Sequence, residues 1–389
     1  CGRADARFAA RPHYMSLTTP QTDWRASIER RLTRTREFVD DTDPEALAVV
    51  LASMGSLLAA FVGFLLASPW TAVPLGAFLI ATGYGWARHQ ALVARAVTFA
   101  MTTVTLVTLG LIVAFIFAES IPAFQYETAS VFGVSVPGLG MFAQARWDAV
   151  SEPVRYSLLP MIHGTVMVTA IATLVAAPLG VAAALFIAEI APPRVRELVK
   201  PGIEILAGIP SIVYGFIGFT VINPWASGAF ALNGGSTYLF VGMVVGLMAL
   251  PTVVSVAEDA LTSVPDVMKN GSLALGATDW QSMTSITLPA AFSGVSAAVL
   301  LGVGRAIGET MAATVMLAGI PRISEPLVNV FYGYETLTSL IARGYGSANG
   351  VHESALFAAG VVLFVTVLCL SIGSQYIEAR MRRRLGGAE

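Results

Sequence analysis

Uninterrupted apolar runs dominate this chain of 389 residues and alternate with shorter polar segments. The runs are about 20 residues long, which is the length of an α-helix that crosses a bilayer, and they lack the strict alternation of a transmembrane β-barrel. The pattern predicts an all-α polytopic membrane protein. We expect eight membrane-spanning helices, at residues 46–67, 69–87, 98–118, 161–188, 203–223, 238–257, 291–317 and 353–377.

The composition supports this fold class. Charged residues make up 12% of the chain and hydrophobic residues 55%, whereas soluble domains carry about 25% charged residues. A soluble domain, a disordered chain and a nucleic-acid-binding protein are therefore excluded. The two cysteines and four histidines have no ligand spacing, so we expect no metal site and no cofactor.

The distribution of basic residues predicts the orientation of the spans. With the N-terminus inside, the inner segments hold 18 of the 23 Lys and Arg residues, and the outer segments hold four. Loops rich in Lys and Arg stay in the cytoplasm. We therefore expect a multi-pass protein of the cell membrane with both termini cytoplasmic. The outer basic residues are Arg146, Arg155, Arg322 and Arg343.

Four regions follow from this arrangement. Residues 1–45 form a polar cytoplasmic tail without a secretory signal, and we expect translation to begin at Met15 rather than a lipidated Cys1. Residues 46–97 hold two additional helices, 98–380 form a main transmembrane domain, and 381–389 form a basic tail. The long connections 119–160, 258–290 and 318–352 are candidates for partner or substrate contacts.

Lysine usage argues against catalysis by this chain. Its only lysines are Lys200, followed by Pro201, and Lys269, followed by Asn270. A P-loop requires Gly-Lys followed by Ser or Thr to hold phosphates. We therefore expect a non-catalytic subunit, and any ATP hydrolysis would take place on another chain.

The inner connection 258–290 carries the most specific motif. Asn270, Gly271 and Ser272 are followed by Gly276 and then, after nine residues, by Ile286, Leu288 and Pro289. This spacing resembles the cytoplasmic motif of ABC importer permeases, which begins Glu-Ala-Ala, although Asn270 replaces the Glu. The resemblance implies an amphipathic coupling helix at about 262–275, a turn at Gly276 and a second helix to Pro289, docked on a cytosolic ATPase. An ordinary interfacial helix–turn–helix remains the alternative.

Two further segments, 206–215 and 302–312, resemble phosphate-importer permeases of the PstC type, and the resemblance covers about 98–380. It implies the six-span core of binding-protein-dependent permeases, here with two added N-terminal helices. It also implies four kinds of partner: two copies of a cytosolic ABC ATPase, a second permease, an extracytoplasmic phosphate-binding protein, and membrane lipid. No nucleic acid is implied.

Arg305 and Glu309 are the candidate substrate-path residues with the strongest physical argument. They lie four positions apart near the middle of span 291–317, so they share one helix face, and Glu309 is the expected counter-ion of Arg305 when no anion is bound. A central Arg costs about 2.5–3.5 kcal/mol to insert, so it should face protein or water, and its guanidinium suits an oxyanion. A purely structural Arg–Glu pair is the alternative. In span 203–223, Pro210 should bend the helix and expose the hydroxyls of Ser211 and Tyr214 to a central path. A kinked helix that serves only packing is the alternative.

Other functions stay open from the sequence alone. Arg305 does not distinguish phosphate from sulfate, molybdate or tungstate. A secondary transporter would require carboxylates in several spans, and Glu309 is the clear acid within a span. An intramembrane serine protease would pair Ser211 with a histidine, but the predicted spans place no histidine near a centre.

Overall fold

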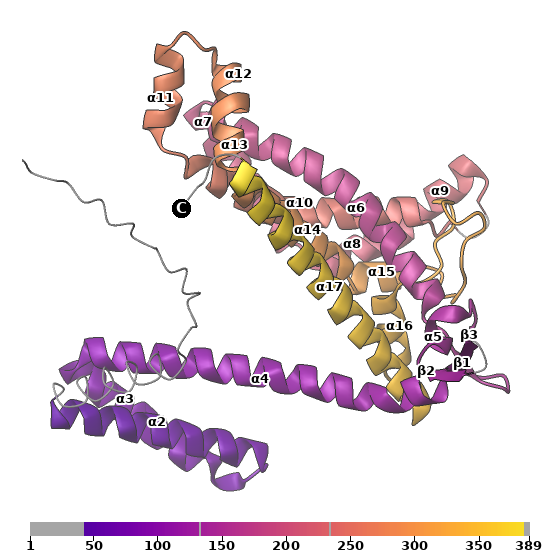
Figure 1. Cartoon of the computed structure of the whole chain (residues 1–389), viewed down its shortest axis with the longest axis horizontal. Coiled ribbons are helices and arrows are strands. Elements are labelled where there is room, and N and C mark those ends of the chain that lie inside the picture. The colour runs from indigo at the N-terminus through magenta and orange to yellow at the C-terminus, as the bar shows by residue number, and fades with distance from the viewer. Residues whose placement is uncertain (1–42, 132–133, 233–234, 385–389) are drawn as a thin grey trace, which may run out of the picture. The chain divides into compact units, whose positions relative to one another are not determined.

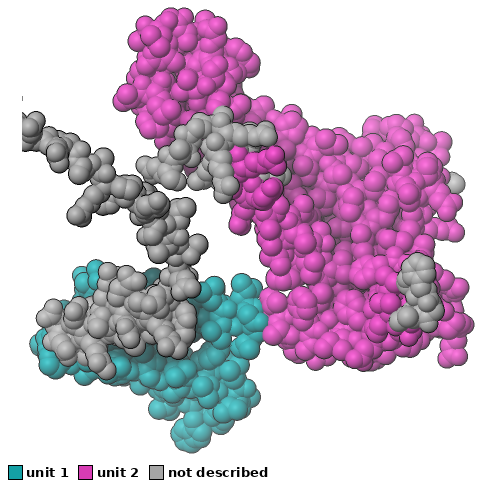
Figure 2. Space-filling model, in the orientation of Figure 1, with its two compact units in different colours: residues 1–111 teal, residues 112–389 magenta. Residues whose placement is uncertain are grey.

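The computed structural model describes residues 43–131, 134–232 and 235–384. It divides into two compact units, Cys1–Leu111 and Ile112–Glu389, which are coloured separately in Figure 2. The predicted N-terminal tail 1–45 falls almost entirely outside the described residues, as does most of 381–389.

Unit 1 contains a pair of helices and the first part of a third. These are α2 (Pro44–Leu65), a short 3-10 turn η1 (Pro69–Thr71), α3 (Ala72–Arg88) and the beginning of α4 (Gln90–Tyr126). Asp43 caps α2, and Gly85 lies against Val49 and Val93 so closely that a Cβ there would be 2.6 Å from each side chain. The predicted additional helices 46–67 and 69–87 correspond to α2 and α3. The second of them is the shorter, with 17 residues against 22 in α2.

Unit 2 begins with a small β-containing region. The end of α4 is followed by the hairpin of β1 (Thr128–Val131) and β2 (Val134–Pro137), then α5 (Gly140–Ala143) and the pair β3 (Trp147–Asp148) and β4 (Arg155–Tyr156). Both pairs are antiparallel, with Thr128 opposite Pro137 and Trp147 opposite Tyr156. The strands were not predicted, since the sequence indicated only a long connection at 119–160.

The helices that follow form the body of unit 2. They are α6 (Leu159–Leu185) with a π-helical end η2 (Phe186–Ile190), α7 (Pro193–Gly208), α8 (Ser211–Ile217), η3 (Gly218–Ile222), α9 (Asn223–Phe230) and α10 (Tyr238–Thr262). Next come α11 (Asp266–Ala274), α12 (Asp279–Ser282), η4 (Met283–Thr287), α13 (Leu288–Ala290), α14 (Phe292–Ile307), α15 (Met311–Met316), α16 (Leu337–Gly344) and α17 (Val351–Arg384).

The centre of unit 2 is the close pair α6 and α10. A Cβ at Gly242 would lie 2.6 Å from Ile171, and one at Gly246 would lie 2.9 Å from Val175 and from the Ala172 carbonyl. Small residues at these positions let the two backbones approach, which is the usual way in which membrane helices pack. The buried side chains of Val168, Val241 and Val245 fill the contact.

Among the described residues, length and apolarity identify five helices that could each cross a membrane, and up to seven if two bent helix pairs each count as one span. The bent pairs are Pro193–Gly208 with Ser211–Phe230, at 85°, and Asp279–Ala290 with Phe292–Ile307, at 72°. The five helices, the two bent pairs and α3 together lie at the positions of the eight predicted spans.

Three predicted spans differ in detail from the helices of the structure. Span 203–223 bends at Pro210, as the sequence predicts, and the bend places 203–208 in a different helix from Ser211–Ile217. Span 291–317 is also broken, since α14 ends at Ile307 and α15 begins at Met311. Residues 90–97, assigned to a connection, continue into α4, because they contain no helix-breaking residue.

Figure 1 shows how the ends of unit 2 differ. The α11, α12 and α13 segments lie with α7 and the last turns of α17 at one end, and the strands lie at the other end with α5 and the beginning of α17. At the latter end, Tyr156 stacks on His352 at 5.7 Å between ring centroids, and Trp147 contacts the same ring. The β-containing region is therefore fixed to α17.

Candidate functional site

The bend before α8 is set by Pro210. Proline disfavours a helical conformation in the residue before it, and Ile209 has extended dihedral angles (φ −71°, ψ 125°). The helix restarts at Ser211, which is half-buried in the first turn of α8. The Tyr214 hydroxyl donates a hydrogen bond back across the bend to the Leu206 carbonyl, at 3.1 Å. One of the two predicted hydroxyl groups thus stabilises the bend.

The break between α14 and α15 changes the predicted role of Glu309. Because α14 ends at Ile307, Arg305 and Glu309 do not share a helix face. The side-chain carboxylate of Glu309 accepts a hydrogen bond from the Ala312 backbone N–H at 3.0 Å. The backbone carbonyl of Glu309 accepts another from the Thr338 hydroxyl at 2.7 Å. No ion pair joins Arg305 to Glu309 among the described residues. The predicted Arg–Glu pair is therefore wrong, and Glu309 holds the first turn of α15.

Arg305 lies at the wall of a cavity of about 640 Å³ between α10, α14 and α17. The cavity presents neutral polar side chains from two other helices, and among the residues whose side chains the structure describes no carboxylate lines it. Its polar lining residues besides Arg305 are Thr252, Ser371, Ser374 and Gln375. The remaining lining residues are Ala, Leu, Gly and Val. A guanidinium in a cavity that also presents hydroxyl and amide groups can bind an oxyanion through charge and hydrogen bonds together.

The α17 side chains of this cavity were not among the residues predicted from the sequence. Ser371, Ser374 and Gln375 follow each other at helical spacing in the last apolar span, which is a weak signal without knowledge of the neighbouring helix. Of the four predicted path residues, only Arg305 lines the cavity.

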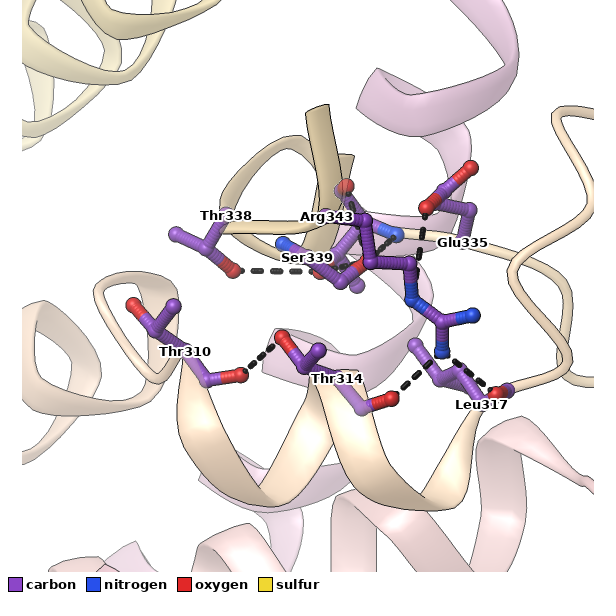
Figure 3. A network of polar contacts seen from close by, with 8 residues as sticks. Thr310, Thr314, Leu317, Glu335, Thr338, Ser339 and Arg343 are labelled. Carbon is purple, nitrogen blue, oxygen red and sulfur yellow. Dashed lines mark hydrogen bonds and ion pairs between the residues drawn. The ribbon is translucent and has the colours of Figure 1, made fainter. Parts of the chain in front are cut away.

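A polar network connects α15 with α16 (Figure 3). The Arg343 guanidinium donates to the carbonyls of Thr314 and Leu317, at 2.8 Å for Leu317, and lies 3.8 Å from a Glu335 carboxylate oxygen. It thereby satisfies carbonyls at the C-terminal end of α15, which have no partner within the helix. Thr336 begins α16 with a capping box to Ser339.

Glu335 has an unusual environment in this network. Its carboxyl is buried, and burial raises its pKa to about 7, although the Arg343 charge acts in the opposite direction. Burial prevails because the guanidinium is 3.8 Å away and partly exposed to solvent, which weakens its attraction. Glu335 lies outside the membrane-spanning helices, in the segment that joins α15 to α16.

The predicted coupling loop forms a lobe that protrudes from unit 2, visible at the upper left of Figure 2. The amphipathic helix begins at Asp266 rather than near 262, because α10 continues to Thr262. Gly276 has φ +88°, a conformation that other residues adopt with strain. The second helix then runs, partly as a π-helix, through Ile286, Leu288 and Pro289 to Ala290.

Individual motif residues have distinct positions in this lobe. Asn270 and Gly271 are exposed on α11. The Ser272 hydroxyl donates to the Ser282 hydroxyl at 2.7 Å and so joins the two helices. Large apolar side chains on the lobe are also exposed, namely Val267, Met268, Leu273, Leu275 and Trp280. Exposed apolar side chains of this size are typical of a surface that a partner covers.

Comparison with known proteins agrees with this architecture. Residues 176–383 match the family described as "Binding-protein-dependent transport system inner membrane component". The phosphate transport system permease protein PstC of Mesorhizobium japonicum is 32% identical over 312 residues, which cover 75% of this chain and 91% of that protein. The probable ABC transporter permease protein YqgH of Bacillus subtilis is 37% identical over 238 residues, covering 61% and 76%.

Solved structures show the same fold. A chain of a bacterial ABC transporter involved in the import of alginate aligns with a TM-score of 0.51 at 16% identity, over 73% of this chain and 95% of that chain. The same transporter in complex with its alginate-bound periplasmic protein gives a TM-score of 0.51 at 17% identity, over 78% and 98%. With the family match and the relatives above, these findings show that the chain belongs to the inner membrane components of binding-protein-dependent transport systems, among the permeases of the PstC type.

Proposed function

We propose that this chain is the transmembrane permease subunit of an ATP-driven importer of inorganic phosphate. It forms the translocation path with a second permease, couples to two copies of a cytosolic ABC ATPase, and receives phosphate from an extracytoplasmic binding protein. The observation that carries the proposal is the position of Arg305 in a cavity with neutral hydrogen-bonding side chains. The similarity to phosphate permeases supports phosphate as the anion.

The energetics of Arg305 favour a role on the path. Its side chain is exposed in the isolated subunit, and no acid among the described residues forms an ion pair with it. A guanidinium facing lipid at mid-membrane would cost about 2.5–3.5 kcal/mol. A water-filled path or a bound anion removes that cost. Thr252, Ser371 and Gln375 can then contribute hydrogen bonds to the same anion.

The lobe of α11, α12 and α13 supplies the docking surface for the ATPase. It combines a short helix, a glycine turn and exposed apolar side chains. An amphipathic helix of this kind can fit into a groove of a partner and move with it. The chain has no P-loop lysine, so ATP hydrolysis belongs to the partner.

Docking at this lobe also gives an orientation. The last turns of α17 lie at the same end of unit 2 as the lobe (Figure 1), and α17 carries Arg380, Arg382, Arg383 and Arg384 near its end. A cytoplasmic lobe therefore places the C-terminus in the cytoplasm, as the positive-inside rule requires. The strands at the opposite end then face outside. We assign residues 46–97 to the additional helices and 98–380 to the permease domain.

The test is phosphate uptake by the complete complex in proteoliposomes. Arg305→Ala should abolish uptake without preventing assembly, and Arg305→Lys should retain partial uptake, since it keeps the charge but loses the planar fork. Because Arg305 and Glu309 are not paired, the double variant Arg305→Ala, Glu309→Ala should stay inactive. Normal uptake by Arg305→Ala would refute the proposed path.

Competition experiments separate the oxyanions. A tenfold excess of unlabelled phosphate should suppress the uptake of labelled phosphate, whereas sulfate, molybdate and tungstate should not. Stronger suppression by one of those three anions would assign the importer to that anion instead.

A further inference from the structure

We infer that Lys269 and Glu189 form the link through which the coupling helix α11 moves the inner end of α6. This inference rests on the proposed function, because it takes the lobe of α11 to α13 as the element that an ATPase moves. It assigns a positioning role to two residues that contact neither the substrate nor ATP.

The contact itself is short and partly shielded. The Lys269 Nζ atom lies 2.7 Å from a Glu189 carboxylate oxygen, and the side chains are 17% and 16% exposed. Lys269 is in the middle of α11, and Glu189 is in η2 at the end of α6. Partial removal from water strengthens the attraction between opposite charges relative to a surface pair. The two elements are thus held together at one defined point.

The other connections of α11 permit rotation. Short segments, 263–265 and 275–278, join it to α10 and α12, and the second segment contains Gly276 with φ +88°. The bond from Ser272 to Ser282 ties α11 to the following helix. Within the described part of the chain, the pair with Glu189 is the only ion pair of α11. Without it, turns at both ends could absorb a displacement of the docked helix.

Beyond Glu189, the packing can transmit a displacement inward. The Arg196 guanidinium of α7 donates to the Ala188 carbonyl at 2.9 Å, so α7 and α11 meet at η2. Next to η2, α6 packs closely on α10, and a Cβ at Gly180 would lie 2.7 Å from Val253. A Cβ at Gly302 of α14 would lie 2.5 Å from the same Val253. Val253 therefore lies between α6 and the helix that carries Arg305.

The chain offers a matched control at the same end. Its only other lysine, Lys200 of α7, lies 2.9 Å from a carboxylate oxygen of Glu258 in α10, with side chains 45% and 5% exposed. This pair has the same residue types as Lys269 and Glu189 but does not involve α11. A general effect of losing an ion pair would appear in the variants of both pairs. A specific effect on coupling would appear only in the variant of Lys269 and Glu189.

The experiment uses the complete complex, with both permeases, the ATPase and the binding protein, reconstituted in proteoliposomes. Three double variants are compared with the wild type: Lys269→Met with Glu189→Gln, Lys200→Met with Glu258→Gln, and the charge exchange Lys269→Glu with Glu189→Lys. The neutral double variants leave no unpaired charge, which limits the loss of folding. Assembly is measured by co-purification, and coupling as phosphate transported per ATP hydrolysed.

We expect the neutral Lys269–Glu189 variant to assemble and hydrolyse ATP, while phosphate transported per ATP falls by about two- to thirtyfold, the range of 0.5–2 kcal/mol found for changes in coupling. The charge exchange should restore most of the ratio, and the Lys200–Glu258 variant should keep it. A normal ratio in the first variant, an equal fall in the control, or an assembled charge exchange without recovery would each overturn the inference.

Failure of the proposed function gives a different result. If the wild-type complex transports no phosphate, the proposed substrate is wrong. The link is then tested by the stimulation of ATP hydrolysis on adding the binding protein. That stimulation should fall in the neutral Lys269–Glu189 variant and not in the control, and an unchanged stimulation overturns the link.

Discussion

Replacing Glu335 by glutamine should remove a pH dependence from the segment that joins α15 to α16. Burial raises the pKa of this carboxyl from 4.5 to about 7. Its protonated form is therefore favoured in the folded segment. The stability that this proton contributes is fully present below about pH 4.5 and is lost as the pH rises through about 7.

The magnitude follows from the pKa difference. Each pKa unit corresponds to about 1.4 kcal/mol, so ionisation of Glu335 should make local opening about 2–3 kcal/mol easier at pH 8 than at pH 5. This is roughly a 30- to 150-fold change in the opening constant. Glu335→Gln keeps the size of the side chain and cannot ionise, so its segment should be equally protected at both pH values.

Hydrogen exchange of residues 317–343 in detergent-solubilised protein measures this opening, after correction for the intrinsic pH dependence of amide exchange. Glu353→Gln removes an exposed acid at the first turn of α17 and serves as the control; it should leave the pH dependence unchanged. Equal protection of the wild type at pH 5 and pH 8, or a persistent pH dependence in Glu335→Gln, would refute the reasoning.

Two glycines give further predictions. Gly276 has φ +88°, and a Cβ added there would meet no atom within 4 Å. Substitution therefore costs backbone strain alone, about 1–2 kcal/mol for Val and less for Asn. The Gly276→Val complex should assemble but transport less phosphate per ATP hydrolysed, and Gly276→Asn should have a smaller effect; an equal ratio in both variants would contradict this. A Cβ at Gly164 would lie 1.9 Å from the Glu335 carbonyl oxygen, so Gly164→Ala should destabilise the protein by about 1–3 kcal/mol and lower its melting temperature in detergent, whereas Gly373→Ala, with open space around it, should not.

Local signals in the sequence were sufficient for the lobe and for the bend before α8. Gly276 interrupts an amphipathic pattern, and Pro210 cannot continue a helix without disturbing the residue before it. Both effects act within a few residues, so the sequence predicted a turn at each place. The angle of 85° at the bend, however, depends on how α7 and α8 pack.

The break between α14 and α15 was not predictable in the same way. Its glycine lies in an apolar run that is compatible with a continuous helix. In the structure, the Thr338 hydroxyl donates a hydrogen bond to the backbone carbonyl of Glu309 from 29 positions away. This distant partner satisfies a backbone group that a continuous helix would have satisfied itself. The predicted pairing of Arg305 with Glu309 was wrong for this reason.

Short segments of the sequence were sufficient to predict the membrane-spanning class, the glycine turn of the lobe and Arg305 as a candidate residue, because apolar length, glycine conformation and the cost of a buried charge are local properties. The packing of the helices places Ser371 and Ser374 in the cavity with Arg305, and Glu189 beside Lys269, 80 positions along the chain. A hydroxyl or a carboxylate in an apolar run has many conceivable partners, and helix packing selects the one that it meets.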